Sequence, residues 1–332
     1  MTETAFELIW DRSSLGYSLA AAYLLDLALG DPRGWPHPVR AIGWLVARGE
    51  QLMRRTVSWE RRAGLLLVLL VLLVTGVAVA AALWAASLVG YWARVAAEVA
   101  WIYWGLATRS LASETLGVVR AAERSDWDTA RRELAMIVGR DTAELSPEAI
   151  HRACIETVAE NMTDAVVSPL FFTALAGPVG LWLFKAASTM DSMIGHRDER
   201  YARFGWAAAR LDDVLNFIPA RITFLLMPIA ALFAGGRPLA AWRIGWRDGR
   251  KHASPNAGVA EATMAGALGV QLGGPATYGG APVERLLIGD PGPPASATTV
   301  RRAVAVMVLS SLIAFILAES AVALASAACT RN

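Results

Sequence analysis

The chain has 332 residues, of which 55% are hydrophobic and 18% charged, and its mean hydropathy is +0.41. Soluble globular domains rarely carry so much apolar sequence, and several apolar segments reach membrane-spanning length, so we predict an integral membrane protein. The net charge of +2 and the absence of a basic tail argue against a nucleic-acid-binding protein.

The N-terminal third of the chain predicts three helices. Residues 1–12 contain three acidic side chains, unlike the basic start of a secretory signal peptide. Residues 64–89 carry no charge and are long enough to cross a membrane, and we also expect membrane helices over residues 14–30 and 92–108. The last of these holds Arg94 and Glu98, which are spaced to pair on one helix face.

Two apolar segments in the middle of the chain are interrupted. Gly177-Pro178 divides residues 166–187, and prolines that include Pro228 divide residues 214–235. Broken backbone at membrane depth is tolerated only where protein or a water-filled cavity covers the freed polar groups. We therefore expect a functional site nearby.

A final span is predicted over residues 303–329, and arginine pairs precede both this span and residues 64–89. These pairs are Arg61 with Arg62 and Arg301 with Arg302. The positive-inside rule places such ends in the cytoplasm. The sequence therefore predicts an all-α, multi-pass protein of the cell membrane with about four to six membrane helices, some broken or re-entrant. We expect residues 1–332 to form a single membrane-embedded domain.

Four polar regions separate the apolar segments. They cover residues 31–62, 109–164, 188–213 and 236–302. In the second region, residues 120–138 have helical periodicity, and Ser146 is placed to cap a helix that begins at Pro147. The fourth region is rich in glycine and proline, so it is expected to be loop-rich.

Three carboxylates in the second polar region recur every four residues. On an α-helix, Glu156, Glu160 and Asp164 would form one stripe whose like charges repel unless a cation or another partner compensates them. A stripe of this kind is typical of a functional site. The alternative is a solvated helix face on which Arg152 pairs with Glu156, and spacing alone does not decide between the two.

Several kinds of site are excluded by spacing. Lys185 and Lys251 do not follow a phosphate-binding glycine loop, and the four histidines lack zinc-binding spacing. Cys154 and Cys329 are far apart and predict neither a disulfide nor a metal site. The glycines after Ala265 could approach phosphates or could serve turns and helix packing. Mg²⁺ on carboxylates remains the most plausible metal.

Four long segments of the chain resemble one known family. They are LLDLALGDPRGWPHPVRAIGWL (24–45), ETVAENMTDAVVSPLFF (156–172), STMDSMIGHRDERYARFGWAAARLDDVLNFIPARIT (188–223) and SPNAGVAEATMAGALGVQLGGPATYGG (254–280). They resemble the membrane-bound adenosylcobinamide-phosphate synthases of cobalamin biosynthesis, the CobD/CbiB family. The resemblance runs from about residue 20 to the C-terminus. The family commonly has Gly, Asn, Tyr and Trp where this chain has Ala165, Ser188, His196 and Val259. None of these departures removes a carboxylate.

The resemblance implies an ATP-dependent ligase. Such an enzyme joins a carboxyl group of adenosylcobyric acid, the corrinoid substrate, to the amine of an aminoalcohol or its phosphate and gives adenosylcobinamide or its phosphate. A carboxylate is most simply activated as an acyl phosphate, which requires Mg²⁺ and positive groups around the transferring phosphoryl. The amine must be neutral to attack, which requires a base nearby. If ATP is the co-substrate, the four polar regions should share a cavity that faces the cytoplasm, and residues 166–187 should then be re-entrant at Gly177-Pro178 instead of a full crossing.

Candidate residues within the resembling segments are assigned by chemical type. The catalytic candidates are Glu160, Asp164, Asp191, Asp212 and Asp213. Of these, Glu160, Asp164 and Asp191 are the candidate metal ligands. The substrate-binding candidates are His37, Arg40, Asn161, Arg200, Arg210, Arg221, Asn256 and Glu261.

Two other functions and a homo-oligomeric state stay open. A transporter would also have broken helices and buried charges, but its polar residues should lie within the spans. A structural scaffold that holds other corrinoid enzymes at the membrane would tolerate replacement of the carboxylates. Alanine substitution of those residues therefore separates a scaffold from an enzyme.

Overall fold

The structure is a computed structural model that describes residues 14–32, 34–196 and 198–329, so the acidic segment predicted over residues 1–12 lies outside it. The described chain forms two compact units. Unit 1 consists of residues 14–107, 168–215 and 315–329, and unit 2 consists of residues 108–167 and 216–314.

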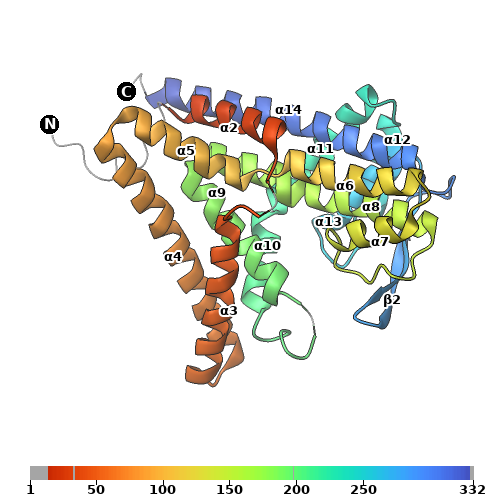
Figure 1. Cartoon of the computed structure of the whole chain (residues 1–332), viewed down its shortest axis with the longest axis horizontal. Coiled ribbons are helices and arrows are strands. Elements are labelled where there is room, and N and C mark those ends of the chain that lie inside the picture. Colours follow the sequence, from red (N-terminus) through yellow and green to blue (C-terminus); the bar gives the residue numbers. More distant parts are fainter. Residues whose placement is uncertain (1–13, 33, 197, 330–332) are drawn as a thin grey trace. The chain divides into compact units, whose positions relative to one another are not determined.

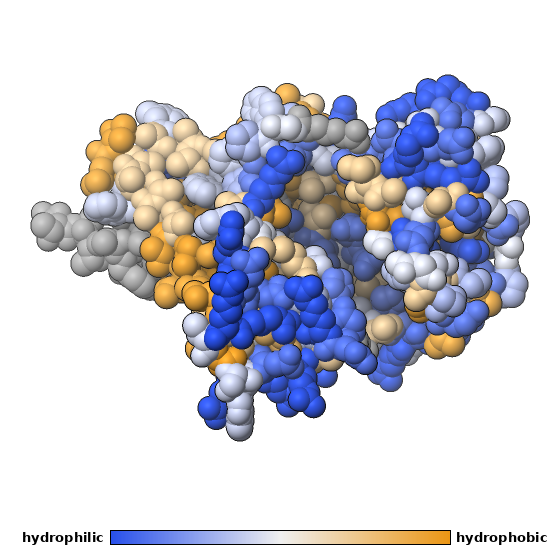
Figure 2. Space-filling view, turned by 60° about the horizontal axis from the view of Figure 1, so that its bottom comes forward, coloured by the Kyte–Doolittle hydropathy of each residue, from blue (hydrophilic) through white to orange (hydrophobic). Residues whose placement is uncertain are grey.

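Unit 1 is entirely helical (Figure 1). It contains α2 (Leu15–Leu29), α3 (Pro38–Thr56), α4 (Glu60–Val89), α5 (Tyr91–Gly105), α9 (Ser168–Ile194), α10 (Trp206–Leu215) and the second half of α14 (Ala297–Cys329). Helix α2 packs along α5, and α4 packs against α3, α5, α9 and α10. The outer side of α4 is apolar, since Leu69, Leu73 and Leu88 are each more than half exposed. Hydrophobic residues gather on this part of the surface in Figure 2, as expected for a helix that faces lipid.

Unit 2 surrounds one buried helix, α13 (Ala257–Leu268). Around it lie α6 (Thr108–Glu123), α7 (Trp127–Ala135), α8 (Pro147–Asn161), the π-helix η1 (Met162–Val167), α11 (Phe217–Phe233), α12 (Pro238–Asp248) and the first half of α14. Strands β1 (Leu272–Tyr278) and β2 (Ala281–Ile288) form an antiparallel hairpin in which Leu272 is opposite Ile288. Because α13 contacts α8, α11, α12 and both strands, it organises the interior of the unit.

Among the described residues, three helical segments are long and apolar enough to cross a membrane. They are Glu60–Val89, Pro147–Ile194 and Ala297–Ala328. Helices α10 and α11 form a fourth if they are counted as one span, which bends by 43° at Asn216. The chain is therefore an all-α, multi-pass membrane protein, as predicted, with the β-hairpin as an addition. The spans predicted over residues 14–30 and 92–108 are helices of 15 residues, and a length of roughly 22 Å is too short to cross the ~30 Å hydrocarbon layer.

Several local predictions are confirmed. The Ser146 hydroxyl accepts a hydrogen bond from the Ala149 N–H at the start of α8, and Pro147 occupies the first helical position. Glu98 accepts a hydrogen bond from Arg94 Nε at 3.0 Å. It also accepts hydrogen bonds from the hydroxyls of Ser14 and Ser18, in and beside α2. Helix α9 is interrupted where predicted, because Ala176 and Gly177 have non-helical dihedral angles. Whether this segment is re-entrant stays a prediction.

Two local predictions are wrong. The helix expected over residues 120–138 is two helices, because Ser125 adopts a left-handed conformation (φ 58°) and the Asp126 carboxylate then caps α7. The region 236–302 is not mainly loop, because it forms α12, α13 and the hairpin. Its glycines occupy defined structural positions: Gly269 ends α13, and Gly279-Gly280 form the turn of the hairpin.

Replacing Gly64 with alanine is expected to destabilise unit 1 by about 1–3 kcal/mol, the usual cost of overpacking. A Cβ at Gly64 would overlap the backbone carbonyl of Phe204, which cannot rotate away as a side chain could. Thermal unfolding of the purified protein in detergent measures this loss. Gly117 in α6 is the control, because a Cβ there meets no atom closer than 3.7 Å, so Gly117→Ala should raise stability by up to about 1 kcal/mol.

Candidate functional site

A group of buried charges lies inside unit 2. We call it the charge cluster, and it consists of Arg140, Glu156, Glu261 and Arg285. Arg285 Nη1 donates to Glu156 Oε2 at 2.9 Å, and Arg285 Nη2 donates to both carboxylate oxygens of Glu261 at 2.9 and 3.0 Å. Arg140 also pairs with Glu156, through the same Oε2 that Arg285 contacts. Both glutamates are 1% exposed, so these are interactions in a low-dielectric interior.

The β-hairpin completes the charge cluster. Arg285 points inward from the middle of β2, where its neighbours Glu284 and Leu286 are exposed. In β1, the Gly273 N–H donates to Glu156 Oε1 at 2.7 Å. Gly273 has φ 84°, and a Cβ at this position would overlap the Leu286 carbonyl, so glycine is required where the strand meets the carboxylate.

Asp141 attaches the loop before α8 to the hairpin. Its carboxylate accepts hydrogen bonds from the N–H groups of Gly279 and Gly280, at 3.3 and 2.8 Å. Its own N–H donates to the Thr277 carbonyl at 2.8 Å. Because Asp141 follows Arg140, these bonds hold the Arg140 side chain beside Glu156.

The two carboxylates of the charge cluster share two guanidinium groups, so the cluster can be neutral as a whole. Burial raises the pKa of Glu261 to about 8. Arg285 opposes this shift, while the charges of Glu156 and Glu160 add to it. Glu261 therefore exchanges a proton near neutral pH, which is typical of functional carboxyl groups.

His252 lies beside Glu261 on the more open side of the cluster. Its Nδ1 accepts a hydrogen bond from the Ser254 N–H at 3.0 Å, so the neutral ring carries its proton on Nε2. That Nε2 is 3.7 Å from Glu261 Oε1. Burial lowers the pKa of His252, and the negative charge of Glu160 is the strongest influence against that shift. Glu160 itself is exposed, so it forms the solvent side of this group.

A second polar contact joins α11 to the start of α13. Arg221 Nη1 donates to Asn256 Oδ1 at 2.6 Å, and the guanidinium lies over the Phe217 ring at 3.8 Å from its centroid. Two buried threonines, Thr163 in η1 and Thr223 in α11, are hydrogen-bonded at 3.2 Å. These contacts fix α11 against both the π-helix and the helix that carries Glu261.

The structure brings together some of the residues predicted in unit 2. Glu160 lies near Glu261, and Arg221 binds Asn256. Asn161 instead donates to the Thr157 carbonyl one turn earlier at 3.0 Å. Asp164 is half-buried in η1, where the wider π-helical turn interrupts the predicted four-residue stripe.

The alternative of a solvated helix face is wrong for the first residue of the stripe. Glu156 is buried and pairs with Arg140 and Arg285, not with Arg152. Local spacing favoured Arg152, but partners that are distant in the sequence reach the carboxylate once α8 packs against β1.

The remaining predicted residues lie in unit 1. His37 caps α3, because its Nδ1 accepts from the Val39 N–H at 3.2 Å, and Arg40 is exposed in the first turn of the same helix. Arg200 donates to Glu50 at 3.1 Å. Asp191 lies in the last turns of α9, and Asp212, Asp213 and Arg210 lie on α10, where Arg210 and Asp213 are 3.8 Å apart.

No group of three or more His, Cys, Asp or Glu side chains within the described ranges could hold a metal ion. Glu160 and Asp164 belong to unit 2, and Asp191 belongs to unit 1. Neither unit therefore forms the three-carboxylate metal site by itself, and the assignment of these ligands stays a prediction.

Sequence reasoning missed four residues of this site as site residues. They are Arg140, Glu156, His252 and Arg285. Glu156 belonged to the recognised stripe, and His252 lies two residues before the fourth resembling segment, so both had a signal. Arg140 and Arg285 had no such signal, because a single arginine does not stand out as a site residue in a sequence with 29 arginines.

Glu261 is expected to make the protein less stable as the pH rises. Its folded-state pKa of about 8 lies above the ordinary value of 4.5, so the folded form keeps a proton that the unfolded chain has released. The stabilisation is complete below pH 4.5 and disappears as the pH rises through 8. Unfolding midpoints across this window should fall less steeply for Glu261→Gln than for the unaltered protein. Equal slopes would contradict the shift.

Comparisons with known proteins agree on one family. Residues 19–307 match the family model described as CobD/Cbib protein. The chain is 49% identical over 292 residues to the cobalamin biosynthesis protein CobD of Geobacter metallireducens, which covers 88% of this chain and 92% of that protein. It is 41% identical over 300 residues to the cobalamin biosynthesis protein CbiB of Salmonella typhimurium, with 89% and 94% covered. No solved structure matches the chain significantly.

Proposed function

The chain belongs to the CobD/CbiB protein family, which confirms the resemblance of the four segments, and from this premise we propose a biosynthetic ligase. The protein acts in cobalamin biosynthesis. Its reaction joins adenosylcobyric acid to an aminoalcohol or its phosphate through an amide bond, with ATP as co-substrate, at a site that faces the cytoplasm.

The convergence of the resembling segments supports this proposal. In unit 2, the segments 156–172 and 254–280 meet where the Gly273 N–H donates to Glu156, and Arg221 from the third segment binds Asn256 from the fourth. In unit 1, α3 packs against α9, and a Cβ at Gly43 would lie 3.5 Å from Met193 Sδ. Segments far apart in the sequence thus meet at polar and closely packed positions.

The observation that carries the proposal is the contrast between two carboxylates of unit 2. Glu261 is buried and has a pKa of about 8, whereas Glu160 is exposed beside it. A base is most effective when its pKa lies near the working pH, so Glu261 suits removal of a proton from the attacking amine. Environments that separate two carboxyl groups in this way commonly divide their roles.

Glu160 and Asp164 are the residues that would hold Mg²⁺. Mg²⁺ usually takes one or two carboxylates and completes its shell with water and phosphate oxygens, so an exposed and a half-buried carboxylate in one segment fit it. When bound with ATP, the ion would offset the negative charge on the transferring phosphoryl group. His252 Nε2–H, which lies 3.7 Å from Glu261 Oε1, is a donor for an oxygen of the substrate.

The proposal is tested by conversion of defined substrates. The purified protein would be incubated with adenosylcobyric acid, ATP, Mg²⁺ and either an aminoalcohol or its phosphate, and the corrinoid product would be analysed by mass spectrometry. The expected product has the mass of the amide and forms only when ATP is present. Unchanged adenosylcobyric acid under all conditions would refute the ligase and favour a scaffold.

A further inference from the structure

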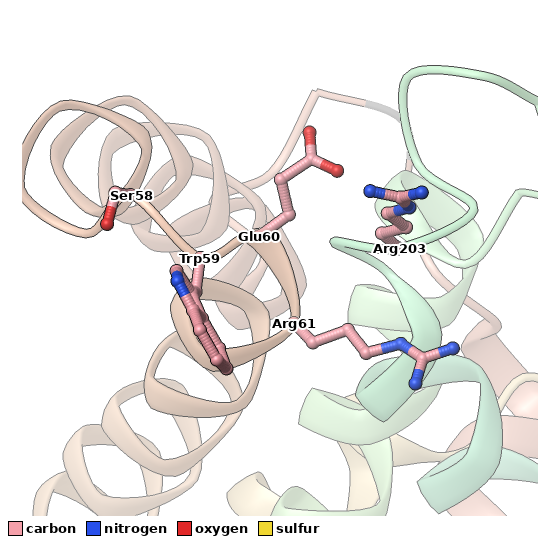
Figure 3. Close-up of a pocket in the computed structure, with 5 residues that line it drawn as sticks. All are labelled: Ser58, Trp59, Glu60, Arg61 and Arg203. Atoms are coloured by element: carbon pink, nitrogen blue, oxygen red, sulfur yellow. The ribbon is translucent and has the colours of Figure 1, made fainter.

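A cavity in unit 1 lies beside the first turn of helix α4 and has no lining residue in common with the charge cluster. Its volume is about 570 Å³, and it is lined by Ser58, Trp59, Glu60, Arg61 and Arg203. Figure 3 shows the Glu60 carboxylate and the Arg203 guanidinium pointing toward one another, while Arg61 extends from α4 on the same side. Because α4 is a membrane span, the cavity lies at the end of a span.

The wall that carries Arg203 is held in place by helix α3. Glu50 is only 7% exposed, and it accepts hydrogen bonds from Arg54 Nε at 2.9 Å and from Arg200 Nη2 at 3.1 Å. Arg54 also donates to the Arg200 carbonyl at 2.9 Å, and its guanidinium lies 4.1 Å from the centroid of the Phe204 ring. The segment on both sides of Arg203 is therefore fixed before any ligand binds.

Positive charge in the cavity is left without a carboxylate partner. Glu60 is compensated by Arg54 at 3.4 Å. In the part of the chain that the structure describes, no carboxylate lies within 4.0 Å of Arg61 or Arg203, and Arg61 instead lies over the Trp206 ring. No side chain caps the start of α4, so its first N–H groups add to the positive potential.

We propose that this cavity binds a phosphate group through Arg61 and Arg203. Guanidinium groups donate paired hydrogen bonds to phosphate oxygens, and a ring stacked beneath one of them holds its plane in position. The phosphate has two possible sources with the same chemistry. One is the phosphate of a small aminoalkyl phosphate, in which case the inference rests on the proposed function, and the other is the headgroup of an anionic phospholipid.

Two binding measurements on the full-length protein distinguish these sources. In the first, the protein in a neutral detergent is titrated calorimetrically with O-phosphoethanolamine and, separately, with inorganic phosphate. In the second, the protein is placed in bilayer discs of phosphatidylcholine with one-fifth phosphatidylglycerol, and the retained lipids are counted by mass spectrometry. Neither measurement requires enzymatic turnover. Both results can therefore be interpreted even if the protein shows no ligase activity.

The substitutions Arg61→Gln and Arg203→Gln should each weaken binding about tenfold, since each removes a charge-assisted contact with phosphate. Arg48→Gln is the matched control, because this exposed arginine of α3 does not line the cavity and should bind as before. Unfolding midpoints show whether each variant is folded. If the Arg61→Gln variant is unfolded, Arg203→Gln decides, because Arg203 is exposed and lacks the contact that Arg61 makes with the Trp206 ring.

Each outcome decides the inference. Arginine-dependent binding of O-phosphoethanolamine identifies a site for a soluble phosphate, and arginine-dependent retention of phosphatidylglycerol identifies a lipid site. If the unaltered protein binds neither, or if the cavity variants bind as tightly as Arg48→Gln, the inference is overturned.

Discussion

Replacing Glu156 with alanine is expected to lower the free energy of unfolding by about 3–5 kcal/mol, the usual cost of breaking a buried ion pair. Arg140 is 11% exposed and pairs with Glu156 alone among the described residues, so it would keep a buried charge without a partner. Arg285 would retain only Glu261, and the Gly273 N–H would lose its acceptor. Unfolding of the purified protein in detergent measures the loss.

Two comparisons show whether this loss comes from burial. Glu123→Ala removes an ion pair with Arg301 whose side chains are both nearly half exposed, so it should cost only about 0–1 kcal/mol. In a chain that already carries Arg140→Met, Glu156→Ala should cost less, because one of the stranded charges is gone. Equal losses for Glu156→Ala and Glu123→Ala would contradict the buried cluster.

Local features of the fold could be predicted from the sequence, because the interacting residues lie within a few positions of each other. Ser146 and Pro147 start α8, Arg94 pairs with Glu98, and Gly177 interrupts α9. The hairpin could not be predicted in the same way. Its glycines resemble those of a loop, and its pairing is stabilised by contacts with α8 and α13.

The candidate site was predictable only in part for the same reason. Glu261 and Asn256 lie in a recognised segment, so their importance could be inferred before their surroundings were known. Arg285 is 129 positions from Glu156, and its neighbours in the sequence form no motif. The π-helix also changes the direction in which Asp164 points, and a four-residue spacing does not reveal such a change.

Replacing Glu261 with glutamine is expected to reduce turnover by at least about 100-fold, because a base that accepts a proton contributes roughly 10²–10⁴-fold. The variant should be at least as stable as the unaltered chain at pH 7, because a carboxyl group with a folded-state pKa of about 8 is mostly neutral there, whereas the unfolded chain gains from ionising it. The unaltered enzyme should become more active as the pH rises through 8, where Glu261 ionises. Amide formation measured across this range tests both statements.

The control for Glu261→Gln is Glu144→Gln, since Glu144 is exposed and outside the charge cluster. It should leave both turnover and stability unchanged. Full activity in Glu261→Gln would remove Glu261 from the reaction and return the role of base to Glu160 or Asp164. A Glu261→Gln protein that unfolds at pH 7 would show that Glu261 serves Arg285 as an ionised partner.

The order in which the chain is made gives Arg140 a further importance. A membrane protein is synthesised and inserted from its N-terminus, so α8 leaves the ribosome well before the hairpin that carries Arg285 exists. During that interval, Arg140, 16 positions before Glu156, is the one of the two arginines of the charge cluster that has already been synthesised. Arg140 can thus act as a provisional counter-ion of Glu156 during biogenesis. The hairpin is synthesised later and adds Arg285 to the charge cluster. A nascent chain that lacks Arg140 would bring Glu156 to the insertion machinery without either of the arginines that pair with it in the folded protein.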